Sequence, residues 1–228
     1  MSEEIARPDS ASAKRFWIGW GAGLGLWVAL LAQAAPYDLA ISRAMTDRGS
    51  AFGQWVAHFG EWPAWAVLLG LVSLSLVPRL RASPRLAALA PLTRAMVALA
   101  LLHPLLITQA LKHGWGRIRF RNLVPGSLDF SPFYHPTGPG TGESFPSGHV
   151  AMAFVLCLVP FYLARRGQRP WLAWLGVLTY GLIVVGGRIL AGAHYLTDCL
   201  FSAGLSMLLA ALLARWLVPG RPGADLSR

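Results

Sequence analysis

Three short polar segments of this 228-residue chain carry side chains suited to phosphate chemistry. They read KHGWGRIRF from residue 112, PSGH from residue 146 and RILAGAHYLTD from residue 188. Their candidate reactive side chains are Lys112, Arg119, His149, Arg188, His194 and Asp198. Three cations, two imidazoles and one carboxylate are the groups that transfer of a phosphoryl group uses, so the three segments predict one site.

The cations and the PSGH turn suit the phosphate itself. Lys112, Arg119 and Arg188 can neutralise a phosphate and the charge that develops on its equatorial oxygens. Arginine does this with a planar fork of donors. Ser147 and Gly148 begin an apolar segment, where the unpaired backbone N–H groups and the dipole of a helix favour an anion.

The remaining residues suit the covalent chemistry. His194 and Asp198 are four positions apart, so we expect them on one face of a helix that begins near them. A carboxylate that binds one ring nitrogen fixes the tautomer and makes the other nitrogen a better nucleophile. This leaves His149 as the acid that protonates the leaving oxygen.

Each segment also has a simpler interpretation. The cations could bind anionic lipid headgroups, PSGH could only start a helix, and the His–Asp pair could lie at a helix end. Arg117 and Arg121 flank the first motif. They could bind a second phosphate or a headgroup, or could contact an anionic surface alone, and the sequence leaves both open.

The composition indicates an integral membrane protein. Hydrophobic residues make up 55% of the chain, charged residues only 13%, and the mean hydropathy is +0.49, whereas soluble domains carry about a quarter charged residues. The net charge of +10 does not indicate a nucleic-acid partner, because the basic residues fall between apolar runs. Cys157 and Cys199 lie in apolar segments and are predicted to be small core residues.

Six apolar segments are long enough, or nearly so, to cross a bilayer as helices. We expect them at Phe16–Ala35, Trp62–Val77, Leu92–Leu111, His149–Ala164, Trp171–Gly187 and Asp198–Val218. The predicted fold is all-α, a six-helix membrane bundle over residues 16–218 with polar tails at 1–15 and 219–228. Ala32-Gln33-Ala34 resembles a signal-peptidase site, but the first apolar run is longer than a signal peptide needs, which favours an uncleaved helix.

The loops predict an orientation. Basic residues gather before the first span, between spans two and three, between four and five, and around the end of span six, which makes that side cytoplasmic. The opposite side then receives the outer loops at residues 36–61, 112–148 and 188–197, and the three polar segments fall at the outer membrane–water boundary. The loop at 122–142, rich in proline, glycine and aromatic residues, could cover the site or form an interfacial rim.

The three segments together resemble the signature of the type 2 phosphatidic acid phosphatases, membrane lipid phosphatases related to vanadium haloperoxidases. That signature reads Lys-x6-Arg-Pro, Pro-Ser-Gly-His and Ser-Arg-x5-His-x3-Asp, and the chain matches it from Lys112 to Asp198. Two positions differ, because Phe120 stands in place of proline and Gly187 in place of serine. The resemblance covers about residues 92–215.

The resemblance implies a mechanism that needs no metal or other cofactor. His194 would attack phosphorus and form a phosphohistidine, Asp198 would orient it, and His149 would protonate the leaving group and then activate water. The residues expected to hold the phosphate are Lys112, Arg119, Arg188 and the backbone of Ser147 and Gly148.

We therefore expect a lipid phosphatase of the cell inner (plasma) membrane, with its active site facing the periplasm or cell exterior. Candidate substrates are phosphatidic acid, phosphatidylglycerol phosphate, undecaprenyl diphosphate and lipid A phosphate, and the sequence does not choose among them or fix the oligomeric state. A lipid phosphotransferase with the same site is the alternative. A transporter or channel fits less well, because the polar residues cluster at one end instead of lining a path across.

Overall fold

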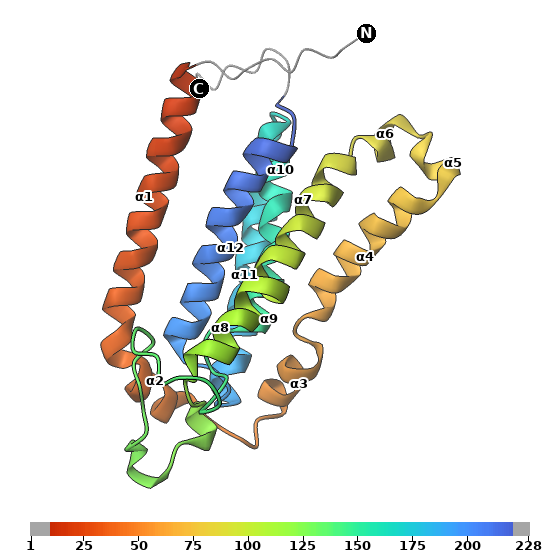
Figure 1. The fold of residues 1–228 in the computed structure, drawn as a ribbon. Helices are drawn as coiled ribbons and strands as arrows, with labels where there is room; N and C mark the ends of the chain where they lie inside the picture. Colours follow the sequence, from red (N-terminus) through yellow and green to blue (C-terminus); the bar gives the residue numbers. More distant parts are fainter. Residues whose placement is uncertain (1–9, 221–228) are drawn as a thin grey trace.

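The structure is a computed structural model that describes residues 10–220, and Figure 1 shows a bundle of long helices. Within residues 10–220, six helical stretches are long and apolar enough to cross a membrane, which confirms the six predicted spans. They are Ala11–Met45, Ala51–Leu76, Pro84–Asn122, Gly148–Arg165, Trp171–Leu190 and Leu196–Leu217. The outer parts of the two predicted tails, residues 1–9 and 221–228, lie outside the described residues.

Several spans consist of more than one helical segment. The first three spans and their links contain α1 (Ser10–Ala34), η1 (Ala35–Tyr37), α2 (Asp38–Met45), α3 (Ala51–Phe59), α4 (Trp62–Leu76), α5 (Pro78–Arg81), α6 (Pro84–Ala87), α7 (Ala90–Ala100), η2 (Leu101–Ile107) and α8 (Thr108–Trp115). The remainder contains η3 (Phe120–Asn122), η4 (Pro125–Ser127), α9 (Gly148–Ala153), η5 (Phe154–Cys157), α10 (Leu158–Arg165), α11 (Trp171–Leu190) and α12 (Leu196–Leu217).

Two helices occupy what the sequence predicted as an outer loop at residues 36–61. In α3, Phe52, Val56 and Phe59 recur at helical spacing, which gives the segment an apolar face. Ser50 caps it, since its side-chain oxygen accepts a hydrogen bond from the Gly53 N–H at 3.2 Å. The segment is too short to cross a membrane alone, which is why a search for spans missed it.

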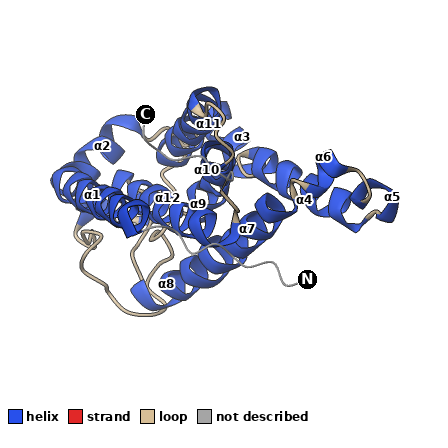
Figure 2. Ribbon diagram, turned by 90° about the horizontal axis from the view of Figure 1, so that it is seen from above, coloured by secondary structure: helices blue, strands red, loops and turns tan. Residues whose placement is uncertain are grey.

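The helix α12 lies at the centre of the bundle, packed against α1 on one side and against α7, α9 and α10 on others (Figures 1 and 2). The helices α4, α5 and α6 extend away from the rest in both views. Against α12, the indole N–H groups of Trp20 and Trp27 donate to the carbonyl oxygens of Leu208 and Leu200, at 3.1 and 3.0 Å. These contacts make α1 part of the bundle.

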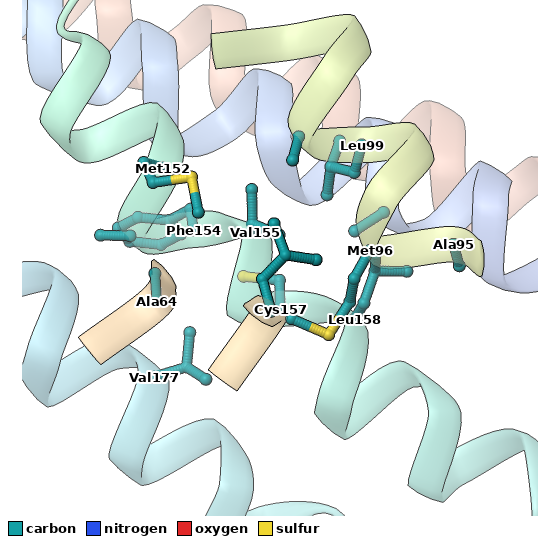
Figure 3. Close-up of a cluster of buried hydrophobic side chains, with 14 of the residues drawn as sticks. Ala64, Ala95, Met96, Leu99, Met152, Phe154, Val155, Cys157, Leu158 and Val177 are labelled. Atoms are coloured by element: carbon teal, nitrogen blue, oxygen red, sulfur yellow. The ribbon is translucent and has the colours of Figure 1, made fainter. Parts of the chain in front are cut away.

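The apolar core surrounds the short helix α9 and its continuation. Figure 3 shows Met96 and Leu99 of α7 beside Val155 and Leu158, with Ala64 of α4 and Val177 of α11 on the other side. Cys157 and Cys199 are both buried free thiols, as predicted. Since these side chains pack around α9 on several sides, the start of that helix has a fixed position in the bundle.

Candidate active site

The three polar segments meet at one end of the bundle, the lower end in Figure 1, where α8 and α11 end and α9 and α12 begin. Lys112 lies in the last turn of α8 and Arg188 in the last turn of α11. Ser147 is the residue before α9, and Asp198 lies in the first turn of α12. Residues far apart in the sequence are thus gathered around His194, which lies in the turn between α11 and α12.

His194 is held in one orientation by the chain itself. Its side chain is 1% exposed, and its Nδ1 lies 2.5 Å from the carbonyl oxygen of Ser144. A carbonyl oxygen only accepts, so Nδ1 carries the proton and Nε2 keeps its lone pair. This is the tautomer that a nucleophilic imidazole needs.

Burial also decides the charge of this ring. Burial lowers the pKa of His194 from 6.5 to about 3, because the charged form would lose its hydration. The nearby Asp198 opposes this shift, whereas the positive charges of Arg188 and Lys112 add to it. The imidazole is therefore neutral at neutral pH.

Asp198 supports His194 in a way that differs from the prediction. The helix begins at Leu196, so His194 precedes it, and the two residues do not share a helix face. Asp198 Oδ2 lies 3.8 Å from His194 Nδ1, too far for a hydrogen bond. The same oxygen instead accepts from the Ser144 hydroxyl at 2.6 Å and from the Tyr195 N–H at 3.0 Å. Asp198 thus holds the residue whose carbonyl orients the ring.

Arg117 is placed where the headgroup interpretation does not hold. Its side chain is 0% exposed. Its Nη2 lies 2.9 Å from Asp38 Oδ2, its Nη1 lies 2.5 Å from Asp198 Oδ1, and its Nε donates to the Ser131 carbonyl at 2.9 Å. The expectation that Arg117 binds a headgroup is therefore wrong, because two buried carboxylates and a carbonyl already use its donors.

Asp38 is a supporting residue that the sequence analysis missed. It begins α2, just after the predicted span Phe16–Ala35, and is fully buried. Its oxygens accept from the Thr197 N–H at 2.9 Å, from the Thr197 hydroxyl and from Arg117. The available signal was a carboxylate at the end of an apolar span, since a charge there usually has a partner.

A cation cluster, formed by Lys112, Arg119 and Arg188, lies beside His194. The three side chains are close enough for their positive charges to repel one another. Arg119 Nε and Arg188 Nε are buried and have no hydrogen-bond partner among the described residues. Lys112 Nζ lies 3.7 Å from the point that a Cβ on Gly148 would occupy, so the bare backbone of α9 faces the ammonium group. Free guanidinium donors of this kind suit an anion.

Two predicted anion contacts are modified. The Ser147 N–H donates to the Asp198 carbonyl oxygen at a long 3.4 Å, so it is not a free donor. Arg121 is half-buried, and its backbone is fixed because its N–H donates to the Gly192 carbonyl oxygen at 3.0 Å. Its guanidinium stays a candidate for the headgroup region.

His149 is less buried than His194, with 23% of its side chain exposed. Its Nδ1 is 3.0 Å from Glu61 Oε1, and its Nε2 is 3.0 Å from the Ala57 carbonyl oxygen. Both partners lie in α3 or in the turn that follows it, within the predicted outer loop at residues 36–61. No spacing pattern in the sequence connects Glu61 with His149.

The departure from the family signature at Gly187 has a physical reason. A Cβ at this position would lie 2.4 Å from Val56 Cβ. Serine would therefore collide with α3, whereas glycine lets α3 pack directly on α11. That close approach brings the Ala57 carbonyl and Glu61 to His149.

A helical membrane bundle thus gathers a neutral histidine, a second histidine and a cluster of cations at one end, which is an arrangement for phosphoryl transfer. A profile of the PAP2 superfamily matches residues 91–221, more than half of the chain, and the chain belongs to that superfamily. The superfamily is made of phosphatases, which supports a phosphatase-type activity. Comparisons with curated proteins and with solved structures gave no match.

Proposed function

We propose that the chain is a membrane-embedded lipid phosphatase that works through a phosphohistidine and needs no metal ion. The observation that carries this proposal is the contact between Ser144 and His194. The carbonyl oxygen 2.5 Å from Nδ1 leaves the lone pair on Nε2, in a ring that burial keeps neutral. A neutral, oriented imidazole beside a cluster of cations with free guanidinium donors is what an attack on phosphorus requires.

In the first step the lone pair of His194 Nε2 forms a bond to phosphorus. The bond from phosphorus to the leaving oxygen breaks, and its electron pair stays on that oxygen. His149 gives this oxygen a proton, so the alcohol or phosphate departs neutralised. The cation cluster balances the charge that spreads over the three other oxygens, and the Gly148 backbone lies against it.

In the second step water attacks the phosphohistidine. His149, now neutral, accepts a proton from the water as the new P–O bond forms. The P–N bond breaks, and its electron pair returns to His194 Nε2. Both histidines are then back in their starting states, with inorganic phosphate as the product.

The lipid character of the substrate is inferred from the place of the site. It lies at one end of a bundle whose long helices expose large apolar side chains, among them Leu26, Leu69, Leu106 and Leu182. Arg85 and Arg165 lie at the opposite end of the spans. By the positive-inside rule that end is cytoplasmic, so the site faces the periplasm or cell exterior of a plasma membrane. A headgroup at this boundary would reach the site while its chains stay in the bilayer.

The test is phosphate release by purified protein in EDTA from a panel of four lipids. The panel contains phosphatidic acid, phosphatidylglycerol phosphate, undecaprenyl diphosphate and lipid A. Release from at least one lipid, abolished in His194→Ala, is the expected result. Activity that EDTA removes and Mg²⁺ restores, or activity retained in His194→Ala, would overturn the mechanism.

A further inference from the structure

We propose that Glu61 is a positioning residue for His149, and that it holds the Nδ1 proton so that the Nε2 proton is the one given to the leaving oxygen. This inference rests on the proposed function, since it assigns a partner to the acid of that reaction. The three-part signature does not include Glu61, which lies about ninety residues before His149 in the chain.

The contacts of the His149 ring carry the argument. Glu61 Oε1 lies 3.0 Å from Nδ1, and the Ala57 carbonyl oxygen lies 3.0 Å from Nε2. An ionised carboxylate and a carbonyl are both acceptors only. Both ring nitrogens must therefore donate, and the ring that satisfies both contacts is the doubly protonated imidazolium. In this arrangement His149 already holds the proton that it has to deliver.

The two acceptors are fixed in place by the α3–α4 turn. Trp65 Nε1 donates to the other oxygen of Glu61 at 3.2 Å. The Tyr180 hydroxyl of α11 donates to the Gly60 carbonyl oxygen at 2.5 Å, next to Glu61 in the chain. A Cβ on Gly60 would lie 2.5 Å from the Val56 carbonyl oxygen, so the turn is as tight as glycine permits. These contacts orient the carboxylate before any substrate arrives.

The two contacts have different parts in the proton transfer. The Ala57 carbonyl is a neutral acceptor that a leaving oxygen can replace at Nε2, whereas the Glu61 carboxylate stays on Nδ1. The Nε2–H bond then breaks, its electron pair remains on the nitrogen, and the proton bonds to the leaving oxygen. The product is a neutral imidazole whose remaining N–H still points to Glu61, ready to accept a proton from water.

The charge of Glu61 makes a purely structural role less suitable. The carboxylate lies close enough to Arg188 and Lys112 for their charges to act on it. A negative charge here repels a phosphate, so it weakens the binding of phosphate to the cation cluster. A role in positioning His149 would offset this cost. The pair with His149 accounts for its presence.

The experiment compares leaving groups. An alkyl alcohol needs a proton to depart, whereas p-nitrophenolate departs well without one. We expect Glu61→Ala to lower kcat/KM for hexyl phosphate by about tenfold or more, and to lower it much less for p-nitrophenyl phosphate. Because kcat/KM ends at the first irreversible step, slow hydrolysis of the phosphohistidine does not obscure the comparison.

Two variants serve as controls. His149→Ala should show the same selectivity, with a loss on hexyl phosphate of about a hundredfold or more. Glu143→Ala removes another carboxylate beside the cluster, one that lies 3.4 Å from Arg119 and does not touch His149 in this structure. It should change kcat/KM for the two substrates by the same factor.

The outcomes separate the two proposals. Suppose that His149→Ala lowers kcat/KM more for hexyl phosphate than for p-nitrophenyl phosphate. If Glu61→Ala then lowers kcat/KM equally for both substrates, or for neither, Glu61 does not position the acid and this inference is wrong. If His149→Ala is itself not selective, the acid role in the proposed function fails first. Glu61→Gln decides the part of the charge, since it keeps an acceptor for Nδ1 but is neutral, and full retention of hexyl phosphate turnover would contradict the imidazolium.

Discussion

The two histidines of the site are held by different means. His194 is 1% exposed and rests against a backbone carbonyl, behind which lie Asp198, Arg117 and Asp38 in a fully buried chain of contacts. His149 is 23% exposed and rests against Glu61, which is itself 29% exposed. One ring is fixed deep in the bundle, and the other lies at the edge of the site.

The difference matches what the two proposed roles require. A nucleophile has to keep one tautomer and one direction, and a buried network in which all three guanidinium nitrogens of Arg117 have acceptors gives both. An acid and base has to exchange protons with a leaving group and with water, so it needs partial access to solvent. Burial that makes the first ring neutral would impair the second, because the second has to carry a positive charge.

The largest expected effect comes from breaking the buried network behind His194. Arg117→Met leaves the carboxylates of Asp38 and Asp198 without their shared cation, which costs about 3–5 kcal/mol of the free energy of unfolding. Thermal unfolding in detergent and phosphate release should both show the loss.

Arg169→Met, an exposed site at the other end of the bundle, is the control and should stay near wild type. Arg117→Lys keeps the charge but lacks the planar fork, so it should recover stability only in part. An Arg117→Met protein as stable and active as the control would show that the two histidines are not held so differently.

The second effect concerns the cation cluster. Lys112→Ala and Arg188→Ala should lower kcat by about a hundredfold at any ionic strength, because their charge matters most in the transition state. Arg121→Ala should mainly raise KM, and added salt should imitate it. Steady-state kinetics at two salt concentrations separates these cases. An equal loss of kcat in Arg121→Ala would place that residue in the cation cluster.

The third effect tests the packing that supports His149. Gly187→Ala places a Cβ 2.4 Å from Val56 Cβ, so α3 has to shift, at a cost of about 1–3 kcal/mol. Turnover of hexyl phosphate should fall more than that of p-nitrophenyl phosphate, because Glu61 moves with α3. Gly186→Ala, where nothing lies within 4 Å of the added Cβ, is the matched control. Identical behaviour of the two variants would contradict the role given to Gly187.

The last prediction is a pH dependence of the free energy of unfolding to which the buried His194 ring should contribute. The pKa of His194 is about 3 in the folded protein against an ordinary 6.5, so between these values the unfolded chain binds a proton that the folded one does not. The free energy of unfolding should therefore decrease as the pH is lowered through this window, by at most about 1.4 kcal/mol per pH unit. His194→Gln should reduce this slope in chemical unfolding measurements. An unchanged slope would mean that burial does not keep the ring neutral.

The sequence was sufficient for the class of fold and for the three motifs of the candidate site. Long apolar runs have few alternatives in a membrane, so the six spans followed from composition and length. The spacing of Lys112 and Arg119 predicted the first of the three motifs, and that of His194 and Asp198 predicted the third. These features are local, and local patterns are what a single sequence displays.

The parts that could not be predicted depend on contacts between distant segments. Nothing near Arg117 in the sequence indicates that its partners are Asp38 and Asp198. The backbone carbonyl of Ser144 leaves no trace in residue identity, because every residue has one. The short helix α3 escaped a search for spans, and with it the partners of His149.

The two tryptophan contacts of α1 have a consequence for how the protein is made. Trp20 and Trp27 bind carbonyl groups that lie 188 and 173 positions later in the chain. Asp38 likewise meets Thr197, 159 positions later. The contacts of α1 with α12, and the network behind His194, can therefore form only after α12 has been synthesised. Most of the chain is made before the support of His194 can be complete.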